Sequence, residues 1–186
     1  MSSHGDDNAV LARLVLIGAP GAGKTRMGKR LARILSVPFI DTDKRIVSEH
    51  GPIARIFEEY GEPYFRGLER TVVAEALREP AVVALGGGAV LDEHTQAALA
   101  GAPVVQLTVS AEAVTKRIGG SKRPLLKDGL ADWTRLVDSR RAIYERLAVR
   151  SWDTSLKPLD DIAAEIAEWL RRDSVARTAA HKEQTQ

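Results

Sequence analysis

The sequence predicts an α/β fold, with a parallel sheet covered by helices on both faces of a single domain. Two observations support this prediction. Short apolar runs alternate with amphipathic segments along the chain, and the runs are apolar at consecutive positions. Such strands are buried on both faces, which is typical of parallel sheets in alternating α/β proteins. The 186 residues, 44% hydrophobic and 28% charged, suit one globular domain.

The expected strands and helices follow in alternation. The candidate strands are residues 14–17, 37–40, 81–85, 104–109 and 151–154. The candidate helices, which have apolar positions at helical spacing, are residues 25–35, 62–78, 92–100, 111–118, 132–149 and 159–172. The domain is therefore expected to span residues 11–172. A flexible N-terminus is expected at 1–10, and the polar segment 173–186 is expected to be a disordered tail.

Charge, cysteine content and hydropathy exclude several classes of protein. The net charge of +2 gives no indication of a nucleic-acid partner. The chain contains no cysteine, so disulfides and thiolate metal sites are excluded. The chain start lacks the pattern of a secretory signal, and no apolar run reaches the about 20 residues of a membrane span. We expect a cytoplasmic monomer with no nucleic-acid and no membrane partner.

A phosphate-binding loop is predicted between the first strand and the first helix. Residues 18–25, Gly-Ala-Pro-Gly-Ala-Gly-Lys-Thr, match G-x-x-x-x-G-K-S/T at every fixed position. Glycines let backbone N–H groups turn toward phosphate oxygens, and the helix N-terminus adds partial positive charge. Lys24 is expected to reach the β- and γ-phosphates, and the Thr25 hydroxyl to ligate Mg²⁺. The alternative is a glycine-rich turn that binds nothing. The expected ATP-binding residues of this loop are Gly21, Ala22, Gly23, Lys24, Thr25 and Arg26.

Two carboxylates, Asp41 and Asp43, come directly after the second predicted strand. Ligands of open parallel sheets bind beyond the carboxyl ends of the strands. Phosphoryl transfer needs a metal near the phosphates and a group that positions the acceptor hydroxyl. Because no aspartate ends the third strand, we assign Asp41 to the metal, through water, and Asp43 to the acceptor. Alternatively, one of them caps the following helix, and a helix starting at Thr42 would change their relative direction.

Later residues offer groups that could bind an anion. Three glycines at 86–88 follow the third predicted strand, where they either present N–H groups to a ligand or form a plain turn. Arg66 is expected at a helix start, which disfavours a cation, so it either binds an anionic acceptor or pairs with Glu62 or Glu69. Taken alone, Arg140 is expected to lie on the solvated face of the predicted helix at 132–149. The basic, glycine-flanked segment 119–129 is either a mobile lid over ATP or a solvated loop.

The ordered set of motifs resembles the shikimate kinase family, a small relative of the nucleoside monophosphate kinases. The matching segments are 18–25, 41–43, 65–66 with Glu69, 85–89, 123–126, and Arg140 with Tyr144. The resemblance extends from about residue 14 to 172. It implies a single-domain P-loop kinase whose five-stranded parallel sheet has the order 2-3-1-4-5. It also implies a mobile substrate-binding segment at about 41–70 and a lid at about 119–129.

The resemblance also implies an activity, which is transfer of the γ-phosphate of ATP to the 3-hydroxyl of shikimate. The products would be shikimate 3-phosphate and ADP, on the route to chorismate and aromatic amino acids. ATP and shikimate are then the expected partners, with Mg²⁺ as cofactor. The remaining alternatives are a gluconate or nucleotide kinase on the same fold, or an inactive ATP-binding regulator.

Individual roles follow by resemblance at matching positions. Lys24, Asp43 and Arg123 would be catalytic, with Arg123 on the lid. Arg117 would stack on adenine. Asp43 would hold the shikimate hydroxyls, and Arg66 and Arg140 its carboxylate. The full expected substrate-binding set is Asp43, Phe57, Phe65, Arg66, Gly86, Gly87, Gly88 and Arg140. At Arg26 the chain departs from the family, which usually has threonine there.

Overall fold

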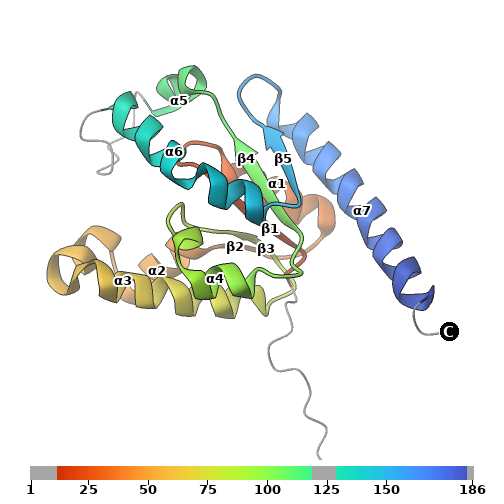
Figure 1. Ribbon diagram of the computed structural model, residues 1–186, viewed down its shortest axis with the longest axis horizontal. Coiled ribbons are helices and arrows are strands. Elements are labelled where there is room, and N and C mark those ends of the chain that lie inside the picture. The colour runs from red at the N-terminus through yellow and green to blue at the C-terminus, as the bar shows by residue number, and fades with distance from the viewer. Residues whose placement is uncertain (1–11, 119–128, 184–186) are drawn as a thin grey trace, which may run out of the picture.

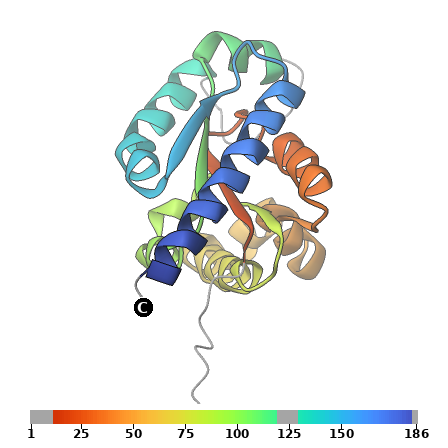
Figure 2. The same ribbon diagram turned by 90° about the vertical axis from the view of Figure 1, so that its right-hand side faces the viewer.

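A five-stranded parallel sheet lies between two layers of helices in the computed structural model (Figures 1 and 2). The structure describes the backbone of residues 12–118 and 129–183, and side chains as far as residue 173. The strand order is β2-β3-β1-β4-β5, and each neighbouring pair is parallel. The predicted fold class and the order 2-3-1-4-5 are confirmed.

All five predicted strands are present, with ends displaced by one or two residues. They are β1 (Leu14–Gly18), β2 (Phe39–Asp41), β3 (Val82–Ala84), β4 (Val104–Thr108) and β5 (Arg150–Asp153). The central strand β1 pairs with β3 through Leu14 and Val82, and with β4 through Val15 and Val104. Because β2, β3 and β1 are parallel neighbours, the segments that follow them emerge at one edge of the sheet.

Within residues 12–118 and 129–183, eight helical segments connect the strands or follow them. They are α1 (Lys24–Leu35), α2 (Thr42–His50), α3 (Ile53–Leu77), the 3-10 turn η1 (Ala89–Leu91), α4 (Glu93–Ala98), α5 (Ala111–Ile118), α6 (Leu130–Leu147) and α7 (Leu159–Glu183). Helix α2 corresponds to the alternative in which a helix starts at Thr42. Within α3, Gly61 is non-helical, with φ 81° and ψ 170°, and Pro63 follows it. The predicted helix at 62–78 is therefore the second part of α3.

Strands β1 to β4 each contribute to two hydrophobic layers because successive side chains of a strand point to opposite faces. Leu14 and Leu16 of β1 belong to the layer formed with α1 and α7. Val15 and Ile17 belong to the layer formed with α3, η1 and α6. The consecutive apolar residues of β1, β3 and β4 are thus buried on both faces, as predicted. The edge strand β5 differs, because only Trp152 of its four residues is half-buried and the others are exposed.

A separate hydrophobic cluster lies between α2 and α3. Its buried members are Ile46, Ile56, Phe65 and Val72. Half-buried Ile53, Phe57 and Leu68 pack against them. No strand residue belongs to this cluster among the described side chains, so α2 and the start of α3 are stabilised mainly by each other.

Helix α7 is longer than the helix that the sequence predicted. Its backbone continues through residues 173–183 (Figure 1), beyond the expected end at residue 172, and disorder of this tail stays a prediction. These residues include no glycine or proline, and Ala, Arg, Lys and Glu among them favour helix. Lack of apolar periodicity indicates lack of burial and does not by itself end a helix. Among the described helices, none is long and apolar enough to cross a membrane.

Candidate active site

The phosphate-binding loop connects β1 to α1 and depends on glycine at several turns. Gly18, Gly21 and Gly23 have φ angles of 138°, 85° and 89°, which favour glycine. At Gly18 a Cβ would also lie 2.2 Å from the Leu107 carbonyl oxygen of β4. The Lys24 ammonium donates to the Gly18 and Ala19 carbonyls at 2.8 and 3.2 Å. The predicted cradle therefore precedes the N-terminus of α1, where backbone N–H groups favour an anion.

Asp41 contacts the loop and also caps a helix. Thr25 Oγ1 donates to Asp41 Oδ2 at 2.7 Å. The other carboxylate oxygen, Oδ1, accepts from the Lys44 N–H at 3.3 Å and caps α2. The hypothesis of a capping role is therefore confirmed for Asp41. The same side chain is placed next to the Thr25 hydroxyl.

These two oxygen groups fit a magnesium ion. Mg²⁺ prefers oxygen ligands, keeps several waters, and is usually held by one or two protein groups together with substrate phosphates. Thr25 Oγ1 and the Asp41 carboxylate supply such groups beside the phosphate loop. The described side chains form no cluster of three or more His, Cys, Asp or Glu residues suited to a metal, so a cage made wholly of such side chains is not available in that part of the chain.

Asp43 lies in the first turn of α2, over the glycine segment that follows β3. A Cβ on Gly86 would lie 2.3 Å from Asp43 Oδ1 and 2.9 Å from Glu69 Oε1. Glycine at position 86 thus allows two carboxylates to approach the backbone. Buried Thr42 accepts from the Gly86 N–H at 3.0 Å and donates to the Ala84 carbonyl at 3.4 Å. These bonds attach the start of α2, and hence Asp43, to the end of β3.

Arg66 lies between two carboxylates of its own helix. Its guanidinium is 2.6 Å from Glu69 Oε2 and 3.1 Å from Glu62 Oε1. It also lies against the glycine segment, since a Cβ on Gly88 would be 2.5 Å from Arg66 Nη1. The pairing alternative is therefore confirmed, but the paired arginine still lies beside the predicted acceptor site. Burial raises the pKa of the Glu69 carboxyl, although Arg66 opposes this shift.

Arg140 of α6 reaches the same glycine segment. Its Nη1 donates to the Gly87 carbonyl at 2.9 Å, and the buried Tyr144 hydroxyl donates to that oxygen at 2.9 Å. Burial raises the pKa of Tyr144, so its hydroxyl keeps its proton. In contrast, Arg141 is exposed and pairs with Asp138. Arg140 therefore does not belong to the solvated face of α6.

Two predicted pocket aromatics lie together beside these groups. The rings of Phe57 and Phe65 are 4.8 Å apart between centroids. Arg66 Cζ is 5.3 Å from the centroid of Phe65. Phe65 is buried and Phe57 is half-buried. The structure thus brings Asp43, Arg66 and Arg140 around the three glycines, and the Phe57–Phe65 pair lies next to Arg66.

Three further residues were predicted to bind ATP, namely Arg117, Arg26 and Arg123, and the structure describes the first two of them. Arg117 donates to the Gly21 carbonyl at 3.3 Å, to Thr154 Oγ1 at 3.1 Å, and to the Thr154 carbonyl. It therefore lies between the phosphate loop and the segment after β5. Arg26 is exposed in the first turn of α1. Arg123, with residues 119–128 of the expected lid, lies outside the described residues.

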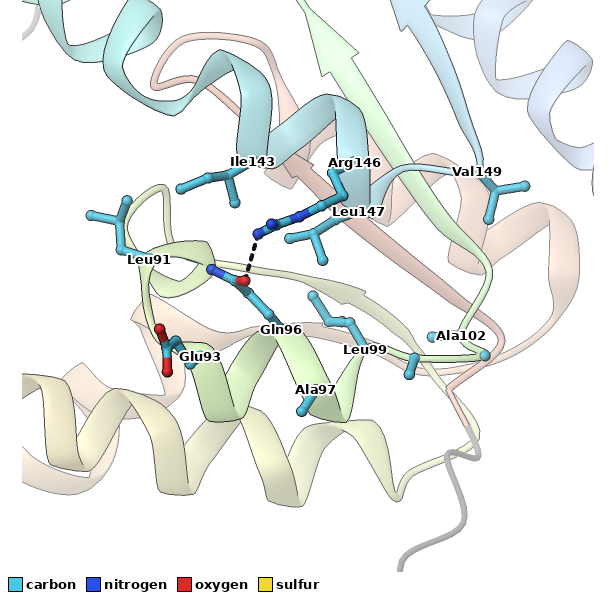
Figure 3. Close-up of a pocket in the computed structure, with 12 residues that line it drawn as sticks. Leu91, Glu93, Gln96, Ala97, Leu99, Ala102, Ile143, Arg146, Leu147 and Val149 are labelled. Atoms are coloured by element: carbon cyan, nitrogen blue, oxygen red, sulfur yellow. Dashed lines mark hydrogen bonds between the residues drawn. The ribbon is translucent and has the colours of Figure 1, made fainter.

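A groove of about 1000 Å³ lies apart from this cluster, between α4 and the end of α6. Leu91, Leu99, Ile143, Leu147 and Val149 form apolar walls, and Arg146 donates to Gln96 Oε1 at 2.7 Å across it (Figure 3). None of the predicted site residues that the structure describes lines this groove. The candidate active site is therefore the edge of the sheet where the phosphate loop, Asp43 and the three glycines meet.

A phosphate loop at the carboxyl edge of a 2-3-1-4-5 parallel sheet is the arrangement of a P-loop kinase, and the Asp–Arg cluster lies beside that loop. Comparison with known proteins then gives the family. The family model described as Shikimate kinase matches residues 20–171. Curated shikimate kinases from Thermobifida fusca and Salinispora tropica are 48% and 45% identical over 160 residues. Both alignments cover 84% of this chain, with 93% and 96% of the relatives. The chain belongs to the shikimate kinase family.

Solved structures agree with this assignment. A shikimate kinase from Acinetobacter baumannii in complex with shikimate has a TM-score of 0.81 and 31% identity, covering 89% of this chain and 96% of that one. A gluconokinase from Sinorhizobium meliloti has a TM-score of 0.55 and 22% identity, covering 93% and 98%. At that identity the second likeness shows the shared fold alone. The predicted family and the predicted enzyme class are confirmed.

Proposed function

We propose that this site transfers the γ-phosphate of ATP to the 3-hydroxyl of shikimate, giving shikimate 3-phosphate and ADP. The observation that carries the proposal is the meeting of Asp43, Arg66 and Arg140 over Gly86, Gly87 and Gly88, beside the phosphate loop. Shikimate has one carboxylate and a hydroxyl that accepts phosphate. Guanidinium groups form strong charge-assisted hydrogen bonds with carboxylates, and Asp43 offers an acceptor for a hydroxyl.

In the proposed mechanism, the acceptor carboxylate binds Arg66 and Arg140. This orientation brings the 3-hydroxyl to Asp43, whose carboxylate accepts its hydrogen bond. Phosphoryl transfer passes through a loose transition state in which positioning and charge stabilisation supply most of the catalysis. Asp43 therefore needs mainly to hold the hydroxyl in line, and Lys24 and Arg123 would stabilise charge on the transferring phosphoryl group.

We further propose that Thr25 and Asp41 hold Mg²⁺, with Asp41 acting through a bound water. When bound, the ion would neutralise charge on the β- and γ-phosphate oxygens. The support is the 2.7 Å contact between the two side chains at the phosphate loop. The cytoplasmic location and the monomeric state expected from the sequence stay predictions.

The test is ADP release from MgATP, measured in a coupled assay with shikimate, gluconate or a nucleoside monophosphate as acceptor. We expect shikimate alone to stimulate ADP release strongly. If gluconate or the nucleoside monophosphate stimulated ADP release and shikimate did not, the acceptor would be that compound and the proposal for shikimate would be wrong. ATP binding without turnover on any of the three would favour the inactive regulator.

A further inference from the structure

Five consecutive carbonyl oxygens of the phosphate loop each accept a hydrogen bond from a side chain. The Lys24 ammonium, which belongs to the motif, takes the first two, Gly18 and Ala19. The next three are bonded by side chains outside the motif. Trp133 Nε1 donates to Pro20 at 2.8 Å, Arg117 Nη1 to Gly21 at 3.3 Å, and Thr154 Oγ1 to Ala22 at 3.0 Å.

Fixing a carbonyl also fixes the amide N–H of the same peptide plane. The two groups point in opposite directions because the peptide bond is planar and trans. A phosphate loop binds through N–H groups that converge on the anion. A glycine-rich loop has more conformational freedom to lose than other segments. Side chains that hold its carbonyls therefore reduce the cost of ordering the loop around a phosphate.

Trp133 is buried, with 4% of its surface exposed, and lies near the start of α6. Its ring packs in a small cluster with Ala19 of the loop and Val114 of α5. A buried indole N–H usually finds a hydrogen-bond partner, and here that partner is the phosphate loop. Packing alone would account for an aromatic ring at this position, but it does not require an N–H.

Thr154 is fully buried and joins three parts of the molecule. Its hydroxyl oxygen is 3.0 Å from both the Ala22 and Thr108 carbonyl oxygens, and it accepts from Arg117 at 3.1 Å. A hydroxyl has one hydrogen to donate, so the two carbonyls share that donor. The Thr154 N–H donates to the Thr108 carbonyl at 3.0 Å and holds the residue at the end of β4.

We infer that Trp133 and Thr154 are positioning residues that hold the phosphate loop in the conformation that binds nucleotide phosphates. Both act through the loop backbone, and Arg117 links Thr154 to the neighbouring carbonyl. The inference rests on nucleotide binding by the phosphate loop, which the proposed function requires, and not on the identity of the acceptor.

The test uses substitutions that delete one hydrogen-bonding group and keep the shape. Trp133→Phe keeps an aromatic ring without the N–H, and Thr154→Val keeps the size without the hydroxyl. We expect each to weaken ADP binding, measured by calorimetry, by about three- to tenfold, because a net hydrogen bond is lost. We expect the KM for ATP to rise in parallel and the KM for shikimate to stay within about twofold.

Two control variants separate this role from plain packing. Thr154→Ser retains the hydroxyl and should restore ADP binding. Trp169→Phe removes an indole that packs against Trp152, at 5.5 Å between centroids, in the layer with α7, and it should leave ADP binding unchanged. If Thr154→Val does not fold, the comparison of Trp133→Phe with Trp169→Phe decides.

Unchanged ADP binding in Trp133→Phe and folded Thr154→Val would overturn the inference. Failure of Thr154→Ser to restore binding, or an equal rise in both KM values, would do so as well. An enzyme that binds ADP but does not respond to shikimate would contradict the proposed acceptor instead, and the ADP-binding comparison would still decide the roles of Trp133 and Thr154.

Discussion

The position of the Asp43 carboxylate depends on two neighbouring residues, Thr42 and Gly86. Thr42 attaches the start of α2 to β3, and Gly86 leaves room for the carboxylate where a Cβ would lie 2.3 Å from Oδ1. The sequence predicted the role of Asp43 from its position after a strand. The sequence also raised a helix start at Thr42, but not the hydrogen bonds by which the buried Thr42 hydroxyl attaches that helix start to the end of β3.

The first residue-scale prediction concerns this carboxylate. Asp43→Asn keeps the size of the side chain but weakens its acceptance of the substrate proton. We expect turnover to fall by at least about 100-fold, a typical contribution of a positioned acid–base group, with ADP affinity within about twofold of wild type. Steady-state kinetics and calorimetry check this. Turnover close to wild type would remove Asp43 from the mechanism.

A second residue-scale prediction separates two adjacent arginines. Arg140→Ala removes the guanidinium that bonds the Gly87 carbonyl beside the predicted acceptor site. We expect the KM for shikimate to rise about 10- to 100-fold, the value of a charge-assisted hydrogen bond, and the KM for ATP to change little. Arg141→Ala, which removes an exposed ion pair with Asp138, is the matched control and should change neither. An unchanged KM for shikimate in Arg140→Ala would contradict the assignment.

At the scale of single elements, aspartate side chains cap the N-termini of two helices. Asp41 caps α2 and Asp92 caps α4 through the Thr95 N–H at 2.9 Å. Asp92 also pairs with Arg70 of α3 at 2.6 Å. Burial alone would raise the pKa of Asp92, but the hydrogen bonds from Arg70 and the Thr95 N–H, with the charge of Arg70, outweigh it and lower the pKa.

A prediction for α4 follows from the sign of that shift. Because the pKa of Asp92 is lower in the folded state, its stabilisation is present above the unfolded value of about 3.9 and is lost as pH falls through the folded value. We expect Asp92→Asn to lower Tm at pH 7, and the difference from wild type to shrink below about pH 4. Thermal unfolding from pH 7 to pH 3 measures this. Exposed Glu93→Gln is the control, and a difference independent of pH would contradict the prediction.

Element types could be predicted from the sequence where apolar periodicity was long enough. The strands β1 and β3 are short but wholly apolar or glycine, and β2 and β4 are mostly apolar, so the sequence predicted them. The fifth strand, β5, is Arg-Ser-Trp-Asp and has no apolar run, although the sequence also predicted a strand there. Helix α2 has one buried apolar residue, Ile46, so its periodicity is too weak to predict a helix. The first part of α3 ends at Gly61, whose positive φ interrupts the pattern. In both segments, packing between the two helices decides the structure.

At the scale of the whole molecule, parallel strands place the phosphate loop, Asp41 and the three glycines at one edge, so much of the candidate site followed from the sequence. The strand order did not, because alternation allows several orders, and it came from the family resemblance alone. Hydrogen bonds such as those from Trp133 to Pro20 and from Thr154 to Ala22 join residues more than a hundred positions apart. The hydropathy pattern of a sequence indicates that such residues are buried, but it does not indicate which backbone carbonyl accepts their hydrogen bond.

The separate cluster formed by Ile46, Ile56, Phe65 and Val72 has a consequence for how the molecule opens. Segments with their own small core can unfold as a cooperative unit at a lower free energy than the whole domain. We therefore expect the backbone amides of α2 and the start of α3 to exchange with deuterium faster than those of β1 and β4. Shikimate, which we propose binds through Asp43 and Arg66, should slow that exchange selectively. Equal exchange rates in both regions would mean instead that the acceptor pocket forms and is lost only together with the sheet.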